Sequence, residues 1–262
     1  MLDKNIYINN VSVIAPGLED IENSEEILKG NLDWLPVELS RMIPSALPAN
    51  EARRTTTVIR LALKVSELAK TTPKTSVVFA SSEGDLDITD KICKALATKD
   101  KMVSPTLFHN SVHNAPAGYL SISNNMKTPS ISLSAGNNTF SAGLIESISQ
   151  VLVEDNDVLL VAYDNITPED LDEFRHFDYP VAIALLLSKS KQADTIGSIN
   201  ISVESQLSNV TPCFNRSLEV VRNGNPIGLG LPLIEALVRR KKTKITIPYL
   251  NQKQLLVRVN DV

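Results

Sequence analysis

The chain has 262 residues, with 26 Lys+Arg against 30 Asp+Glu and a formal net charge of -4. This length allows a buried core, and the slightly acidic balance gives no positive field for nucleic acid or anionic lipid, so we expect neither as a general partner. The sequence holds 2 cysteines and 3 histidines. That supply is too small for a disulfide framework or a zinc site, so we expect no metal, no cofactor and a reducing compartment.

The N-terminal segment carries Asp3 and Lys4 and has no long apolar run. No stretch of the chain reaches the roughly 20 apolar residues that a membrane span requires. We therefore expect no signal peptide, no membrane span and a cytoplasmic location.

Short apolar runs alternate with amphipathic stretches, which is typical of an α/β layer fold. Residues 6–14 predict a first strand, and residues 18–50, interrupted by prolines, predict an irregular surface excursion. From Thr55 the apolar residues recur three or four apart, which predicts a helix. A strand over residues 76–80 and a turn over residues 81–85 then lead into a further helix.

Residues 104–123 predict a polar loop that becomes a small-residue helix. A short strand over residues 129–134 and a helix over residues 139–152 follow. Further strands are expected over residues 158–163, 181–187, 197–203, 244–249 and 254–259. The first two of these do not alternate, as expected of strands covered on both faces, and the last two predict a hairpin. No fixed-period repeat or low-complexity linker intervenes, so we expect residues 1–262 to form a single domain.

The middle of the chain carries the most specific signal. The segment PTLFHNSVHNAPAGYL (105–120) resembles the one before the nucleophile strand in the ketosynthases of the thiolase superfamily, and TPSISLSAG (128–136) resembles the strand that enters their nucleophile elbow. Upstream, RRT (53–55) and FASSEGD (79–85) are similar to the chain-length factors of aryl polyene clusters. The resemblance covers most of residues 1–190 and fades beyond them.

The resemblance implies an α/β, thiolase-like layered fold with a mixed central sheet between helices and an abbreviated second half. Residues 191–262 would be the shortened C-terminal part of one ketosynthase-like domain. The chain is shorter than a full ketosynthase, so part of the duplicated second half would be missing.

The nucleophile position can be located by its spacing in the ketosynthase pattern. That position lies 19 residues after Gly118 (137 − 118 = 19), where this chain has Asn137. Ketosynthases need a cysteine there, because a thiolate near a helix N-terminus takes the acyl group from a carrier thioester. An amide nitrogen cannot form that thioester, so no catalytic residue is expected at the elbow.

Histidine is also scarce where the resemblance requires it. Ketosynthases place two histidines of the C-terminal half around the nucleophile. After the elbow this chain has His176 alone, in a context that matches no motif. Cys213 lacks both a helix start and a paired histidine, which makes it a poor substitute nucleophile. Together these absences argue against condensation chemistry.

Two alternatives stay open for the residues around the expected interface. His109 and His113 are either bonded to loop backbone or belong to the dimer interface and substrate tunnel, and Phe108 is either core filler or a plug that sets the depth of a partner's acyl tunnel. The resemblance makes the tunnel and interface candidates Phe108, His109, Val112, His113, Asn114, Ser130, Ile131, Ser132, Leu133, Asn138 and Phe140.

Weaker signals lie toward the C-terminus. Arg239, Arg240, Lys241 and Lys242 form a basic cluster, which is either a solvated helix end or a docking patch for an acidic carrier protein. The glycines of residues 224–230 predict a turn. The acidic residues Asp164, Glu169, Asp170 and Asp172 suit a helix N-terminus after Pro168.

The resulting hypothesis is a non-catalytic ketosynthase-like subunit, similar to a chain-length factor. It would form a heterodimer with an active β-ketoacyl synthase and help shape the acyl tunnel during polyene or fatty-acid-type elongation. The strand over residues 129–134 is the expected pairing edge. An acyl carrier protein would be a partner through the complex.

Two enzymatic alternatives remain. The first is a decarboxylase that makes primer units from a malonyl carrier, because resembling proteins with glutamine at the nucleophile position are thought to do so and Asn137 is also an amide. The second is a hydrolase that uses Ser111 and His113, although residues two apart point to opposite sides of an extended chain.

Overall fold

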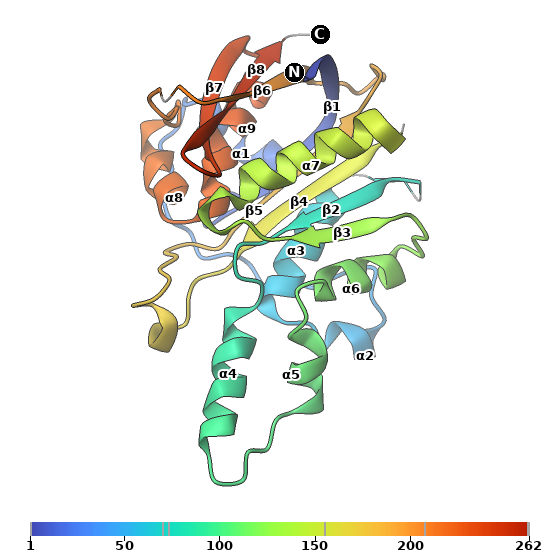
Figure 1. The fold of residues 1–262 in the computed structure, drawn as a ribbon, viewed down its shortest axis with the longest axis vertical. Helices are drawn as coiled ribbons and strands as arrows, with labels where there is room; N and C mark the ends of the chain where they lie inside the picture. The colour runs from blue at the N-terminus through green and yellow to red at the C-terminus, as the bar shows by residue number, and fades with distance from the viewer. Residues whose placement is uncertain (1, 70, 73, 155, 207, 261–262) are drawn as a thin grey trace.

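The computed structural model describes residues 2–69, 71–72, 74–154, 156–206 and 208–260. In this described part, one sheet has the strand order β3-β2-β4-β5-β1-β6-β8-β7 (Figure 1). The strands are β1 (Leu2–Ile14), β2 (Ser76–Ala80), β3 (Ser130–Leu133), β4 (Val158–Asp164), β5 (Val181–Ser188), β6 (Gly197–Glu204), β7 (Thr243–Tyr249) and β8 (Lys253–Asn260). The sheet is mixed, because β2 runs parallel to β3 and β4 while the other pairs are antiparallel.

The helices lie in two layers. The longer ones are α1 (Ile21–Leu28), α3 (Thr57–Leu68), α4 (Leu86–Ala97), α6 (Ala115–Ser123), α7 (Thr139–Glu154) and α9 (Leu231–Val238), and the short ones are α2 (Ala49–Ala52), α5 (Pro105–Asn110) and α8 (Glu219–Asn223). Helix α7 packs on β4, β2 and β5 and also contacts β7, so it covers one face of the sheet (Figure 1). Helices α3 and α6 cover the opposite face of the sheet. This is the layered arrangement that the sequence predicts.

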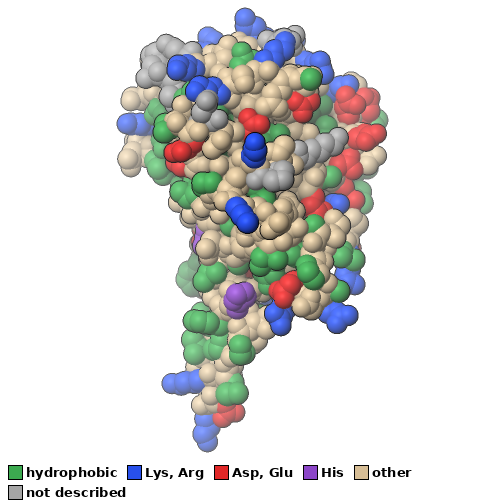
Figure 2. Space-filling model, turned by 90° about the vertical axis from the view of Figure 1, so that its right-hand side faces the viewer, with side chains coloured by type: hydrophobic (Ala, Val, Ile, Leu, Met, Phe, Trp, Pro, Cys, Tyr) green, Lys and Arg blue, Asp and Glu red, His purple; other side chains and the backbone are tan. Residues whose placement is uncertain are grey.

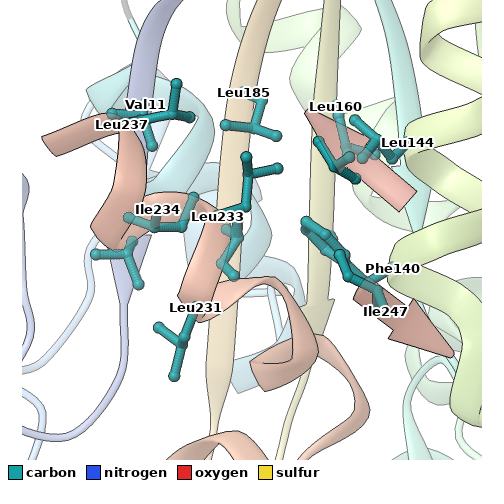
Figure 3. Packing of buried hydrophobic residues seen from close by; sticks show 14 of the residues in the cluster. Val11, Phe140, Leu144, Leu160, Leu185, Leu231, Leu233, Ile234, Leu237 and Ile247 are labelled. Atoms are coloured by element: carbon teal, nitrogen blue, oxygen red, sulfur yellow. The ribbon is translucent and has the colours of Figure 1, made fainter. Parts of the chain in front are cut away.

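The inner layer holds the larger hydrophobic core. Phe140 and Leu144 of α7 and Leu233 of α9 are fully buried over β4 and β5, and Figure 3 shows their side chains pointing into this common layer. Every residue of β4 and β5 is buried. Burial on both faces explains why these two strands read as continuous apolar runs in the sequence.

The end of the sheet formed by β6, β7 and β8 differs on its two faces. In β6, β7 and β8 the inward positions are apolar and buried, for example Ile199, Ile245 and Val257. The alternate positions are polar except for Pro248 and Leu256. Asn200 faces Arg258 across the β6–β8 pair, and Arg258 donates to the Ser202 hydroxyl at 3.1 Å. Because these side chains tolerate water, this end of the sheet needs no covering helices.

Two sequence expectations were wrong. Residues 21–28 form helix α1 inside the region expected to be irregular, because Asp20 caps the helix by accepting a hydrogen bond from the Asn23 amide at 2.7 Å. Residues 105–110 form helix α5 rather than loop, with Pro105 in its first turn. The other predicted strands and helices are confirmed within a few residues at their ends.

Helices α4 and α5 project from the body of the molecule (Figure 1). No helix in the described residues has both the length and the apolar character needed to cross a membrane.

Candidate functional site

A tight turn joins β3 to α7 and holds Asn137 at the surface. The turn is the 3-10 helix η1 (Gly136–Asn138), in which Gly136 has a left-handed φ of 55° that suits a residue without Cβ. The Thr139 hydroxyl donates to the Gly136 carbonyl at 2.7 Å and accepts from the Ala135 amide at 2.9 Å. This network fixes the strand–turn–helix geometry of an elbow, with exposed Asn137 directly before the first turn of α7.

Arg175 covers the elbow from the segment between β4 and β5. Its Nη1 donates to the Asn137 side-chain oxygen at 2.5 Å. Its Nε lies 2.8 Å from a carboxylate oxygen of Glu83, and its guanidinium carbon lies 4.7 Å from the centre of the Phe177 ring. The ion pair and the ring contact orient the guanidinium toward Asn137. Sequence reasoning missed Arg175, because nothing in the local pattern distinguishes it from a solvated arginine.

A cavity of about 290 Å³ opens beside Asn137. Its polar lining comes from Asn137, Arg175, His176, Arg222, Asn223 and Asn225. Amides and guanidinium groups offer hydrogen bonds and positive charge, but these lining side chains include no thiol or hydroxyl nucleophile. The site is suited to binding polar or anionic groups rather than to forming a covalent intermediate.

His176 is the histidine in this cavity lining. Its two ring nitrogens lie 2.6 Å from Asp172 Oδ1 and 2.8 Å from Asp178 Oδ1. The hydrogen bond to Asp172, followed by that to Asp178, raises the pKa of His176 above its usual value. An imidazole that carries its proton between two carboxylates is a poor general base.

The two histidines of the projecting region do not form a catalytic pair. His113 Nε2 lies 3.0 Å from the Ser81 carbonyl oxygen, the backbone contact that one of the two interpretations predicted. The Ser111 hydroxyl donates to the Phe108 carbonyl at 2.8 Å instead of to an imidazole. His109 is exposed near the end of α5. The Ser111–His113 pair therefore lacks the contact that a hydrolase would need.

Asp164 is a buried carboxylate near the elbow. It is 1% exposed at the end of β4, where it accepts from the Ser81 hydroxyl at 2.7 Å and from the Ser82 amide at 2.9 Å. It therefore holds the turn after β2 that carries Glu83. The expectation that Asp164 belongs to an acidic helix start was wrong, because the helical turn after Pro168 comprises Glu169–Leu171 alone.

We expect the buried carboxylate to make stability depend on pH. Burial raises the pKa of Asp164 to about 6 from 3.8, despite the hydrogen bonds that lower it. Between these values the folded state binds more protons than the unfolded state, so the free energy of unfolding falls as pH rises, by on the order of 3 kcal/mol in total. Urea unfolding at a series of pH values is expected to show a flatter dependence in Asp164→Asn.

Exposed Asp33→Asn is the control for that measurement. Glu235, whose pKa burial raises to about 7, adds a similar dependence at higher pH, so the difference between Asp164→Asn and the native chain should be concentrated below about pH 6. An unchanged slope below that pH in Asp164→Asn contradicts the assignment.

Strand β3 forms one edge of the sheet, beside β2. Ile131 of this strand is 40% exposed. Large apolar side chains are also exposed on the neighbouring helices and the segments beside them: Leu96 on α4, Phe108 on α5, Met102 and Val112 before and after α5, and Ile122 on α6. Figure 2 shows hydrophobic side chains gathered over this projecting end. We call the exposed edge of β3 and these five side chains the apolar face.

The structure places the tunnel and interface candidates in two environments. Exposed at or near the apolar face are Phe108, His109, Val112, Asn114, Ser130 and Ile131, and half-buried are His113, Ser132, Leu133 and Asn138. Phe108 is 70% exposed, so the core-filler interpretation is wrong for this chain. Phe140 was expected at the tunnel or interface, and this expectation was wrong. Phe140 is the second residue of α7, points toward Gly230 and is fully buried in the inner core.

The basic cluster is divided by the end of α9. Arg239 and Lys241 line one cavity, whereas Arg240 lines another with the acidic residues Asp20 and Glu22. Arg240 has a left-handed φ of 49°, which reverses the chain after the helix. Lys242 is exposed. The four cations therefore do not form one continuous patch.

The sequence of this chain was compared with models of known protein families. A family model described as the N-terminal domain of β-ketoacyl synthase matches residues 30–245. The chain belongs to this family. The match includes the elbow, the Arg175 segment and most of the shortened second half.

Solved structures share the ketosynthase fold over nearly the whole chain. One is described as a ketosynthase (ApeO) in complex with its chain length factor (ApeC) from Xenorhabdus doucetiae, with a TM-score of 0.75, 23% identity, and coverage of 97% of this chain and 99% of that chain. The ishigamide ketosynthase/chain length factor matches with a TM-score of 0.71 and 11% identity over 98% and 99%. A β-ketoacyl synthase from Burkholderia phymatum STM815 matches with a TM-score of 0.69 and 11% identity over 99% and 100%.

At these identities the likeness shows a shared thiolase-like fold. No curated protein sequence matches the chain. Within the β-ketoacyl synthase fold, the elbow between β3 and α7 and the edge strand β3 are the two features on which a role can be argued.

Proposed function

We propose that the chain is a non-catalytic subunit of the chain-length-factor type, which pairs with an active β-ketoacyl synthase and shapes the acyl tunnel in polyene or fatty-acid-type elongation. The observation that supports the proposal is that Arg175 binds the side-chain oxygen of Asn137, the residue that the sequence spacing predicts at the nucleophile position. The role is therefore one of shape and interface, with the cysteine supplied by the partner.

The chemistry of the elbow supports this proposal. The Asn137 amide cannot attack a carrier thioester, and its oxygen is already held by a guanidinium. His176 is flanked by two carboxylates that favour its protonated form. A condensing enzyme needs a thiolate and unprotonated imidazole groups at this point.

The apolar face supports a partner of the same fold. An edge strand presents unpaired N–H and C=O groups, which an extended strand of a second subunit can satisfy. Ile131 and Phe108 remain exposed in the chain alone, and an apolar face of this kind is stabilised when a partner covers it. Two of the structural neighbours are described as a ketosynthase together with its chain length factor.

The decarboxylase alternative is disfavoured by Arg175. Loss of carbon dioxide requires the carboxylate charge of a malonyl group to move away, and a guanidinium beside that carboxylate stabilises it in the ground state. The Arg175 side chain lines the cavity beside Asn137, so its positive charge is present to hold a carboxylate there in the ground state. The arrangement would slow decarboxylation rather than promote it.

Coexpression with a cysteine-bearing ketosynthase and its carrier protein tests the proposed role. We expect a stable complex that elongates acyl chains, whereas the chain alone neither condenses nor releases carbon dioxide from a malonyl carrier. Phe108→Ala in the complex is expected to shift the products toward longer chains without reducing the amount of complex, because Phe108 is exposed at the apolar face. Failure to form a complex, or turnover by the chain alone, contradicts the proposal.

Introducing a thiol at the elbow is expected to give reactivity without catalysis. The neighbouring Arg175 guanidinium favours the thiolate, so the thiol of Asn137→Cys should react with iodoacetamide roughly tenfold faster than exposed Cys93. Condensation by the chain alone should remain undetectable, because no histidine pair is present to promote it.

Mass spectrometry of the alkylated peptides gives the rates for that variant. Asn137→Cys combined with Arg175→Met is the control, and it should slow alkylation toward the rate of Cys93. Condensation by Asn137→Cys alone would show that the elbow retains a complete catalytic site, contrary to the proposal.

A further inference from the structure

A second cavity, of about 540 Å³, is lined by residues between Thr211 and Ile245, which lie well after the elbow in the sequence. It is formed by the loop of residues 211–216, by α9 and by the start of β7. The proposed partner role does not use it. Its lining combines positive charge with an apolar wall, and these two properties define what it can bind.

Three separate segments bring cations to this cavity. Arg216 comes from the loop, Arg239 from the end of α9 and Lys241 from the turn before β7. The Arg239 guanidinium stacks on Phe214 with its central carbon 3.2 Å from the ring centre, which fixes its orientation. In the described part of the chain, none of the three forms a salt bridge within 4.0 Å, although the charge of Arg239 acts on Glu235 and lowers the pKa of that carboxyl.

Glu235 is the carboxylate in the lining, and it is engaged by the protein. Its two oxygens accept hydrogen bonds from the backbone amides of Phe214 and Asn215, at 2.7 Å and 2.8 Å. Burial raises the pKa of Glu235 to about 7. Its negative charge is therefore reduced near neutral pH and directed at the loop, so the cavity keeps a positive rim.

The remaining lining suits an organic group. Pro212, Phe214, Pro232, Ala236 and Ile245 provide apolar surface next to the cations. The cavity is several times larger than a phosphate ion, so an anionic group at the rim leaves room for a larger attached group on this wall.

We propose that this cavity binds a phosphate ester, with the phosphate held by Arg216, Arg239 and Lys241 and the organic part against the apolar wall. A phosphate monoester carries about −1.5 to −2 charge at neutral pH and matches three cations in the lining of one cavity better than a single carboxylate does. This binding site does not depend on the proposed partner role.

Isothermal titration calorimetry on the full chain tests the proposal with three probes: inorganic phosphate, adenosine monophosphate and coenzyme A. We expect both esters to bind at least about tenfold more tightly than inorganic phosphate, because only they reach the apolar wall. Equal affinities for the three probes, or no binding of either ester, overturn the proposal.

Two double variants with the same loss of charge separate this site from general attraction. Arg216→Ala with Lys241→Ala removes two exposed cations of the rim, and Arg240→Asn with Lys242→Ala removes two cations of the same basic cluster outside the cavity. The first pair is expected to weaken ester binding by at least about tenfold and the second by less than about threefold. Equal losses in the two variants would show non-specific attraction and overturn the proposal. Circular dichroism verifies that both variants are folded.

Discussion

Replacing Ile131 with aspartate is expected to prevent the chain from assembling with a cysteine-bearing ketosynthase. Ile131 lies in the middle of the edge strand β3, pairs in register with Val78 of β2 and is 40% exposed. If a partner covers this edge, the substitution places a carboxylate in an apolar contact. Burying an unpaired charge is costly, so the dissociation constant should rise by at least about 100-fold.

The reason for choosing Ile131 is that its role in the isolated chain is small. An exposed side chain on an edge strand contributes little to the hydrophobic core on either face of the sheet, so Ile131→Asp should fold normally. Loss of the complex then reports on the interface and not on stability. Acyl elongation by the coexpressed pair should fall in parallel with complex formation.

Val203→Asp is the matched control. Val203 is 47% exposed and also lies on a strand, but β6 is in the part of the sheet away from β3. Size-exclusion chromatography with multi-angle light scattering, performed on coexpressed pairs, is expected to show a complex for Val203→Asp and none for Ile131→Asp. A complex of normal stability with Ile131→Asp would place the interface elsewhere.

The strands were the most predictable part of the fold. Burial on both faces made β4 and β5 continuous apolar runs, and the alternation in β7 and β8 was visible because most of their outer positions are polar. Helix α1 was missed because a single capping residue, Asp20, outweighed the breaking effect of the later prolines. The error at α1 therefore came from a local capping interaction that the pattern of apolar residues does not show.

The site was only partly predictable for a different reason. The spacing predicts Asn137 at the nucleophile position, but it gives no sign of Arg175, which is 38 residues away in the sequence and reaches Asn137 through the tertiary fold. The basic cluster appeared as one patch in the sequence and was divided by the left-handed backbone of Arg240. The Arg175–Asn137 contact and the division of the basic cluster both depend on the tertiary path of the chain, which the periodicity of the sequence does not reveal.

Gly230 is expected to be among the least replaceable residues of the second half. It ends the 3-10 helix η4 (Pro226–Gly230), and a Cβ added there would lie 2.5 Å from two ring carbons of Phe140 and 2.9 Å from Ile183 Cδ1. The Phe140 ring is fully buried and has no free space to move into. Gly230→Ala should therefore lower the free energy of unfolding by about 3 kcal/mol.

A second glycine provides the control for urea unfolding followed by circular dichroism. Gly118 lies within α6, and a Cβ there has no neighbouring heavy atom within 4 Å. Gly118→Ala should raise the free energy of unfolding by about 0.5 to 1 kcal/mol, because alanine favours the helix. If Gly230→Ala behaves like Gly118→Ala, close packing is not the reason for glycine at position 230.

A double-mutant cycle identifies the contact responsible. Phe140→Leu removes ring atoms from the space that the new methyl group needs, so it should cost less in the Gly230→Ala background than in the native chain. Phe140 is three residues from Asn137 and lies in the first turn of α7, directly after the elbow. Positive coupling would show that the Phe140 ring is what excludes a methyl group at position 230, and therefore that η4 packs through this glycine against the first turn of α7.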